Sequence, residues 1–171
     1  MREPKDIKIG EFTLKEILER HRHWLFEDCD GWRNMRADLY EANLSRADLS
    51  GADLSGAKNV PFIPMACPDT GAFIGFKKAS GHIVVLEIPA DARRLSATGR
   101  KCRCDKAIVI HIQEMDGTTS DLTEVMSDRD SSFVYKVGKM VSVPDFCEDR
   151  WQECSAGIHF FINRQEAVDY V

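Results

Sequence analysis

The chain has 171 residues, of which 43% are hydrophobic and 30% are charged, and it carries a formal net charge of -5; this suits one ordinary domain with a small appendage. The acidic balance argues against general affinity for nucleic-acid backbones, which depends on many clustered cations. Because no apolar run approaches the roughly 18 residues of a membrane span, and the charged first residues lack the apolar core of a secretion signal, we expect a cytoplasmic protein with reduced cysteines.

Residues 13–26 have the pattern of an amphipathic helix. Thr13 and Glu16 stand at the spacing of a capping box, which marks the start of the helix. The residues that share its apolar face are Leu14, Ile17, Leu18, His21 and Leu25. We expect this face to cover an open end of the segment that follows. A helix that binds a partner or makes a dimer is the alternative.

Four five-residue units follow, with the sequences ADLYE, ANLSR, ADLSG and ADLSG between residues 37 and 56. The array resembles the pentapeptide-repeat family, in which each unit forms one side of a square, right-handed β-helical coil. The resemblance implies that the third residues of the units point to the coil axis: Leu39, Leu44, Leu49 and Leu54. Four sides make one coil, and a repeat that cannot bury its own faces must stack on something. We therefore expect a platform or joint.

Larger pentapeptide-repeat proteins can mimic a DNA duplex through rows of carboxylates. The outward acids of this array are only Asp38, Glu41, Asp48 and Asp53, and Arg46 interrupts them. One short coil does not make such a mimic unless oligomerisation stacks several coils. A structural scaffold that assembles through the coil, or through the N-terminal helix, remains an alternative function.

The repeat pattern fails after residue 57 and prolines follow, so we predict two domains, 1–60 and 61–171. The second domain reads as β-rich, with a hairpin turn at Ser80-Gly81 and an Asn163 cap on a last helix. Its predicted strands lie at 72–77, 83–88, 101–113 (one alternating run), 133–137, 140–143 and 158–162. The predicted fold class is α+β: a short N-terminal helix, one pentapeptide-repeat coil, and a mainly β domain that ends in a short helix.

Several segments of the second domain have a recognisable pattern: Cys67-Pro68, FIGFKK at 73–78, LEIP at 86–89, RKCR at 100–103, VPDF at 143–146 and CSAGIHFF at 154–161. They are similar to an uncharacterised domain that follows pentapeptide repeats in phage and prophage proteins of gut bacteria. The resemblance implies a phage or prophage setting and interference with a host process, including antiviral defence. It implies no particular chemistry.

The densest charged feature is a run of six cations: Arg93, Arg94, Arg100, Lys101, Arg103 and Lys106. Ser96–Gly99 within this run supplies hydroxyls and flexible backbone, which suits an anion such as phosphate or an acidic partner surface. The alternative is a solvated loop and strand whose cations pair with nearby acids. Ion pairs from Arg100 and Arg103 to carboxylates of the domain itself would remove the basis of an anion site.

The cysteines and His159 offer two further hypotheses. Cys102 and Cys104 project from one face of a strand and could bind a metal with Cys147, Cys154 or His159, but their spacing is not that of a zinc knuckle, so we expect no metal and no cofactor. Cys154 and His159 are an alternative site as nucleophile and base, although no orienting acid is evident.

The ending Gly157–Phe161, with Ala167 and Tyr170, is similar to a strand and helix of ADP-ribosyltransferases. Those families place a tyrosine where this chain has His159, and their other nucleotide contacts have no clear match here. We therefore expect a non-enzymatic phage or prophage accessory protein that binds a host protein or a phosphorylated ligand through the basic run. A nucleotide-dependent enzyme is the alternative, and it requires a deep pocket where His159 or Cys154 meets the arginines.

Overall fold

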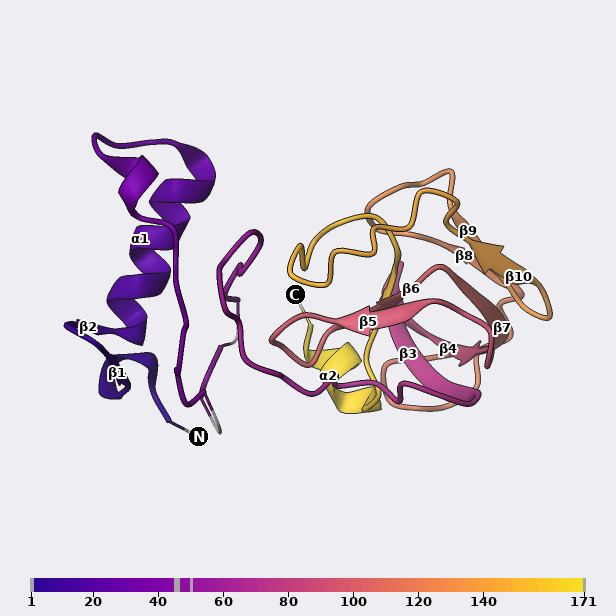
Figure 1. The fold of residues 1–171 in the computed structure, drawn as a ribbon. Helices are drawn as coiled ribbons and strands as arrows, with labels where there is room; N and C mark the ends of the chain where they lie inside the picture. Colours follow the sequence, from indigo (N-terminus) through magenta and orange to yellow (C-terminus); the bar gives the residue numbers. More distant parts are fainter. Residues whose placement is uncertain (1, 45–46, 50, 171) are drawn as a thin grey trace. The chain divides into compact units, whose positions relative to one another are not determined.

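The computed structural model describes residues 2–44, 47–49 and 51–170 (Figure 1). The chain forms two compact units, the first made of Met1–Pro64 with Asp149–Glu153 and the second of Met65–Glu148 with Cys154–Val171. The first unit therefore includes a short segment that returns from the second, which the predicted domains 1–60 and 61–171 did not include. In the part of the chain that the structure describes, no helix has the length and apolar character of a membrane span.

The first unit is built around one helix. Its elements are η1 (Pro4–Asp6), β1 (Lys8–Ile9), β2 (Phe12–Thr13), α1 (Leu14–Phe26) and η2 (Trp32–Asn34). The predicted capping box is confirmed, because the Glu16 backbone N donates to Thr13 Oγ1 at 3.2 Å and the Thr13 backbone N donates to the Glu16 carboxylate at 2.7 Å. The helix stops where Glu27 adopts a left-handed conformation with a φ of 52°.

The repeat segment turns once in every five residues. The backbone N of the alanine that follows each unit donates to the carbonyl of the leucine in that unit, as Ala42 does to Leu39 at 3.0 Å and Ala57 does to Leu54 at 2.9 Å. Twenty residues after Asp38 the chain returns beside it, because Lys58 forms a parallel bridge with Asp38. These contacts do not establish a closed right-handed β-helix, which stays a prediction. Arg46, which we expected to interrupt the outward acids, lies outside the described residues.

All four predicted leucines are buried in one apolar cluster with the face of α1, where Leu14 is 0% exposed. His21 lies in this interface between helix and repeats. Its Nδ1 accepts from the Ala37 backbone N at 3.3 Å and its Nε2 lies 3.1 Å from the Ser55 carbonyl, which fixes a neutral, Nε2-protonated ring. Burial is also the main reason why the pKa of His21 is lowered. His21 is thus a structural link between α1 and the first and last repeat units.

The second unit is a set of antiparallel sheets with one helix, which confirms the α+β class. One sheet has the order β10-β7-β4-β3, a second has the order β11-β6-β5, and β8 pairs with β9. The bounds are β3 (Phe73–Ala79), β4 (His82–Ile88), β5 (Arg94–Ser96), β6 (Cys102–Cys104), β7 (Lys106–Gln113), β8 (Glu124–Met126), β9 (Val134–Lys136), β10 (Met140–Ser142), β11 (Ile158–Phe160) and α2 (Arg164–Asp169). The Ser80-Gly81 turn and the Asn163 cap are confirmed, and β5 and β8 were not predicted.

The prediction of one strand at 101–113 is wrong. Asp105 separates β6 from β7, and the two strands belong to different sheets. Within β7 the register shifts, so that Val85 faces His111 while Leu86 faces Val109, and Ile110 is the additional residue of a bulge. Because a bulge reverses the alternation of faces, Val109 and Ile112 are both fully buried while Ile110 is 39% exposed.

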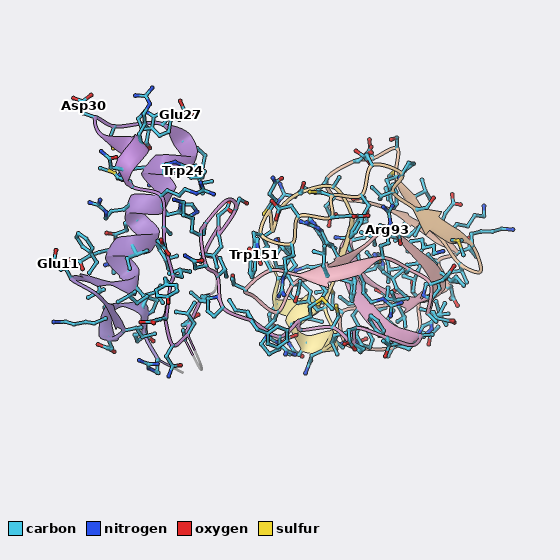
Figure 2. All side chains as sticks on the ribbon, viewed as in Figure 1. Glu11, Trp24, Glu27, Asp30, Arg93 and Trp151 are labelled. Atoms are coloured by element: carbon cyan, nitrogen blue, oxygen red, sulfur yellow. The ribbon has the colours of Figure 1, made fainter. Side chains whose placement is uncertain are left out.

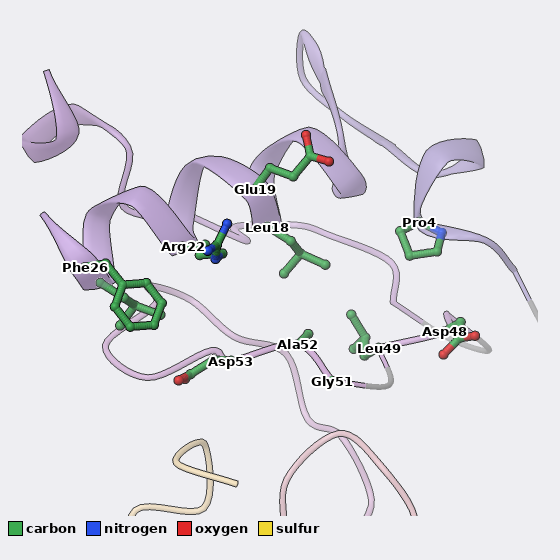
Figure 3. Close-up of a pocket in the computed structure, with 11 residues that line it drawn as sticks. Pro4, Leu18, Glu19, Arg22, Phe26, Asp48, Leu49, Gly51, Ala52 and Asp53 are labelled. Atoms are coloured by element: carbon green, nitrogen blue, oxygen red, sulfur yellow. The ribbon is translucent and has the colours of Figure 1, made fainter. Parts of the chain in front are cut away.

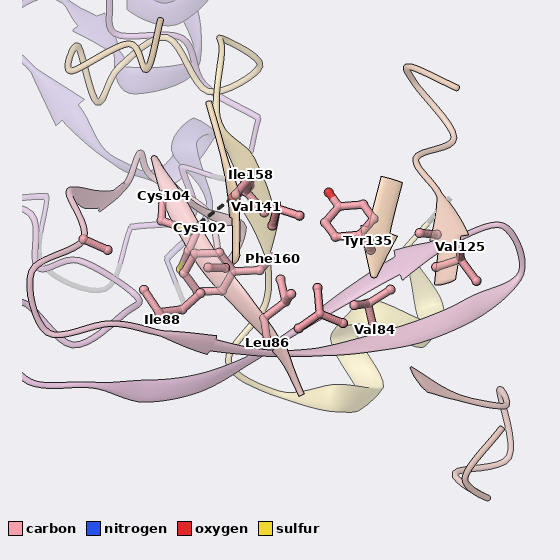
Figure 4. Packing of buried hydrophobic residues seen from close by; sticks show 14 of the residues in the cluster. Val84, Leu86, Ile88, Cys102, Cys104, Val125, Tyr135, Val141, Ile158 and Phe160 are labelled. Carbon is pink, nitrogen blue, oxygen red and sulfur yellow. Dashed lines mark hydrogen bonds between the residues drawn. The ribbon is translucent and has the colours of Figure 1, made fainter. Parts of the chain in front are cut away.

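The core of the second unit lies where its sheets meet (Figure 4). Leu86 of β4, Cys102 of β6 and Phe160 of β11 pack into one cluster, and Tyr135 of β9 belongs to the same cluster. The Phe160 ring lies so close to β3 that a Cβ placed on Gly75 would stand 2.6 Å from Phe160 Cδ2. The glycine is therefore required by packing.

Candidate functional site

A cavity of about 430 Å³ in the second unit gathers cationic side chains from segments far apart in the sequence. Three of the lining residues are Lys77 on β3, Lys101 just before β6, and Arg129 after β8. The others are Ser127, Tyr135, Cys154, Ser155, Ala156, Gly157, His159 and Tyr170. Among the described lining residues, the three cationic side chains stand without a carboxylate side chain.

Lys77 and Lys78 are adjacent on β3 and make different contacts, as expected for consecutive strand residues. Lys78 Nζ donates to the carbonyls of Val168 and Tyr170, at 3.0 and 2.9 Å, and so holds the end of α2. Lys77 lines the cavity, where its Nζ donates to the Lys78 carbonyl at 3.0 Å. Burial is the main reason why the pKa of Lys77 is lowered; the carboxylate of Asp128 acts in the opposite direction, and Arg129 and Lys101 contribute smaller decreases.

Lys101 lies at the wall formed by Cys154 and Tyr170. Its Nζ is 3.6 Å from Cys154 Sγ and 3.5 Å from the Tyr170 hydroxyl, and it stands 5.6 Å from the centroid of the Tyr170 ring. The Tyr170 ring thus offers the Lys101 ammonium a cation–π contact.

His159 lies on β11, opposite Arg103 on β6. Its Nε2 is 3.1 Å from the Ser155 carbonyl, and because a carbonyl only accepts, Nε2 carries the proton. Burial, together with the positive charges of Lys101, Lys77 and Arg103, lowers the pKa of His159 to about 4. The imidazole is therefore neutral at pH 7, with a lone pair on Nδ1.

Arg103 is a buried cation beside this cavity. It is 2% exposed, and its Nη2 donates to the Cys147 carbonyl at 3.0 Å while its guanidinium lies 5.9 Å from the centre of the Phe146 ring. A cation so poorly exposed to water acts on its neighbours through a lower dielectric than a surface charge does. This explains its effect on His159.

Three cations of the predicted basic run pair with carboxylates of the same unit. Arg93 pairs with Asp105 at 2.9 Å and with Glu148 at 2.8 Å, and its position is labelled in Figure 2. Arg100 pairs with Glu166 at 2.8 Å, and Lys106 with Asp91 at 2.6 Å.

Arg94 and Ser96 of the same segment form hydrogen bonds with backbone groups. Arg94 donates to the carbonyls of Pro89 and Ala92, at 2.6 and 3.0 Å, and Ser96 Oγ accepts from the Ala66 backbone N at 2.8 Å. Arg93, Arg100 and Lys106 therefore follow the alternative interpretation, in which the cations of the run pair with nearby acids. Of the six cations, only Lys101 lines the cavity.

Cys154 and His159, the alternative predicted site, do meet in the cavity, together with Lys101. Among the described residues no hydrogen bond joins Cys154 to His159, and no carboxylate of the described lining orients the ring, so a catalytic role of this pair stays a prediction. Cys154 is exposed and His159 is partly buried.

The other candidate metal residues are packed thiols. Cys102 and Cys104 are buried in the core, where burial raises the pKa of Cys104 to about 12, and a hydrogen bond with Cys67 raises the pKa of Cys102. In the described ranges, the one group of three possible ligands is His23, Asp28 and Cys29, in the first unit. His23 Nδ1 and Asp28 Oδ1 lie 2.5 Å apart, so their mutual hydrogen bond accounts for that grouping.

A second cavity of about 310 Å³ adjoins the cationic one, because Ser127, Arg129, Tyr135 and Gly157 line both. Its remaining lining is apolar or acidic: Phe133, Val143, Pro144 and Ile158, with Ser142 and the carboxyl groups of Asp130 and Asp145. The two cavities thus differ in charge on either side of a common wall.

The first unit has a groove of about 450 Å³ between α1 and the repeats (Figure 3). Its middle is apolar, with Leu18 and Leu49, and its charged residues have mixed signs, as Arg22 stands with Glu19 and Asp53. Such a lining does not present charges of one sign to a ligand. The three cationic side chains that line one cavity lie in the second unit instead.

Lys77, Arg129 and Tyr135 are site residues that the sequence interpretation did not single out. Lys77 had a signal in the sequence, because it ends the predicted strand 72–77, whose other residues are apolar. A charged side chain in such a strand indicates a polar partner or a cavity. Arg129 had none, because it lies alone in a polar segment.

A model of a family of unknown function, DUF5758, matches residues 63–167, and a model of pentapeptide repeats (8 copies) matches residues 35–58. No curated protein and no solved structure matched the chain. The longer match contains every residue of the cationic cavity except Tyr170.

Proposed function

We propose that this chain, which belongs to the DUF5758 family of unknown function, is a non-enzymatic binding protein whose second unit binds a small phosphorylated ligand. The observation that carries the proposal is the convergence of Lys77, Lys101 and Arg129 on one cavity, whose described lining includes no carboxylate side chain. Ammonium and guanidinium groups are the side chains that bind phosphate oxygens by charge-assisted hydrogen bonds.

The electrostatics of the empty cavity support the same ligand. Lys77 and His159 both have lowered pKa values, and positive neighbours contribute to each. An anion would offset this mutual repulsion, and each unit of pKa that a group regains corresponds to about 1.4 kcal/mol of interaction. A neutral apolar ligand would leave the repulsion in place.

An enzyme that acts on a nucleotide is the second candidate, because Cys154 and His159 line the same cavity. It is less well supported, since within the described residues no hydrogen bond joins Cys154 to His159 and no carboxylate lines the cavity to orient the ring. Under this candidate, Cys154→Ser would abolish turnover while ligand binding persisted. Under the binding function there is no turnover to lose.

The wider setting of the protein is also a proposal. The resemblance to phage and prophage domains supports a cytoplasmic accessory protein that interferes with a host process, including antiviral defence. A host protein bound through the basic run has less support, because Arg93, Arg100 and Lys106 already pair with carboxylates. We further infer that the repeats make one right-handed coil, supported by a turn every five residues and the bridge from Asp38 to Lys58.

Isothermal titration calorimetry with inorganic phosphate and pyrophosphate tests the binding function. Lys77→Met and Lys101→Met should each weaken binding about tenfold or more, as expected for the loss of a hydrogen bond to a charged group. Arg93→Gln is the matched control, since Arg93 is a paired cation of the same unit that does not line the cavity. The proposal fails if the wild-type chain binds neither anion at millimolar concentration, or if Arg93→Gln weakens binding as much as Lys77→Met.

A further inference from the structure

The common wall of the two cavities constrains what kind of phosphorylated molecule fits. Tyr135 is 2% exposed and, with Arg129, lines both cavities. A ligand with its phosphate beside Lys77 and Lys101 would therefore extend past Tyr135 into the second cavity. The chemistry of that second cavity specifies the rest of the ligand.

The second cavity offers an apolar surface for a flat group. Phe133, Val143 and Pro144 line it, and the Phe133 ring meets the Tyr135 ring edge-to-face with centroids 5.3 Å apart. Aromatic and proline side chains of this kind pack well against the face or edge of a ring. A heterocycle suits this surface better than a branched sugar does.

The same cavity also offers hydrogen-bond acceptors. Asp130 is already engaged, because its Oδ1 accepts from the Ser132 backbone N at 2.9 Å and from Ser132 Oγ at 2.6 Å. The carboxylate of Asp145 is exposed and has no hydrogen bond or ion pair within the described residues. A carboxylate accepts from N–H and O–H groups and repels a second anion.

We infer that the phosphorylated ligand is a nucleoside monophosphate, a deduction that rests on the proposed function. Its phosphate lies with Lys77, Lys101 and Arg129, and its base and ribose lie in the second cavity with their N–H and O–H donors toward Asp145. Asp130 and Asp145, which line only the second cavity, repel the phosphate and so favour this orientation. Inorganic phosphate fills only the cationic half, and an unphosphorylated nucleoside fills only the other.

Calorimetry with the full chain tests nucleotide binding separately from the proposed binding of phosphate. The probes are adenosine and guanosine monophosphates, inorganic phosphate, a pentose phosphate and adenosine. At least one nucleotide should bind about tenfold or more tightly than phosphate, with the pentose phosphate between them. Asp145→Asn should weaken nucleotide binding severalfold and leave phosphate binding unchanged, whereas Lys77→Met should weaken both. Asp69→Asn, at an exposed aspartate outside both cavities, should change neither.

The outcomes distinguish a failure of the nucleotide inference from a failure of the proposed phosphate-binding function. If phosphate binds and Lys77→Met weakens it, but no nucleotide binds more tightly than phosphate, the inference is overturned and the binding function stands. If the wild-type chain binds none of the probes, both are overturned. If a nucleotide binds tightly but Asp145→Asn and Phe133→Leu have no effect on its affinity, the placement of the base in the second cavity is overturned.

Discussion

The neutral, partly buried His159 makes the second unit sensitive to acid. In the folded chain the pKa of His159 is about 4, while an unfolded histidine titrates near 6.5. Between these values the unfolded state binds a proton that the folded state does not. The contribution of this group to stability is therefore fully present above about pH 6.5 and is lost as the pH falls toward 4.

The size of the effect follows from the two pKa values. A difference of about 2.5 units, at about 1.4 kcal/mol per unit, amounts to about 3 kcal/mol below pH 4. By the same linkage, lowering the pH from 7 to 5 costs about 2 kcal/mol. This is a large part of the free energy of unfolding of an ordinary domain, which is about 5 to 15 kcal/mol.

Urea denaturation followed by far-UV circular dichroism at pH 7 and pH 5 measures this loss. The comparison is with His159→Gln, whose amide can still donate to the Ser155 carbonyl but does not titrate. Tryptophan fluorescence would report on the other unit, because Trp24, Trp32 and Trp151 all belong to it. An NMR titration of the His159 ring gives its folded pKa directly.

The variant should lose about 2 kcal/mol less than the wild type between the two pH values. Other acid-sensitive groups, including His21, are common to both proteins and cancel in the difference. Equal losses in the two proteins, or a midpoint near 6.5 in the NMR titration, would refute the claim that burial and the neighbouring cations keep His159 neutral.

Three further outcomes are expected. An anion in the cavity should raise the pKa of His159, so the affinity for sulfate, measured by calorimetry, should increase as the pH falls from 7 to 5. The His159→Gln variant should lack this increase. Gly75→Ala would place a methyl group 2.6 Å from Phe160 Cδ2 and should lower the free energy of unfolding by about 1 to 3 kcal/mol in a denaturant titration. Iodoacetamide should alkylate exposed Cys154 in the folded chain and reach buried Cys104 only on unfolding, as mass spectrometry would detect; equal rates would contradict the packing.

Local patterns in the sequence were sufficient for the elements whose signals are local. The α1 cap depends on two residues three apart, and the Ser80-Gly81 turn on two neighbours, both of which have a positive φ. The run at 101–113 was misjudged because a kink at Asp105 and a bulge at Ile110 interrupt the alternation, and neither carries a local signature.

The basic run illustrates why the site was harder to predict than the fold. Its charges are visible in the sequence, but their partners are not neighbours, since Glu148 lies 55 residues from Arg93 and Glu166 lies 66 residues from Arg100. Pairing decides whether a cation is available to a ligand. A pattern that records only composition and spacing therefore overestimates the available charge.

The sequence by itself determined the repeat units, the cap and apolar face of the first helix, and the β-rich character of the second unit, because each depends on residues a few positions apart. Only the tertiary structure decided which charges remain for a ligand. Lys77, Lys101, Arg129 and His159 come from four separate segments, and the packing of those segments around a common core brings them to one cavity. Contacts between distant segments arise from that packing and leave no local trace in the chain.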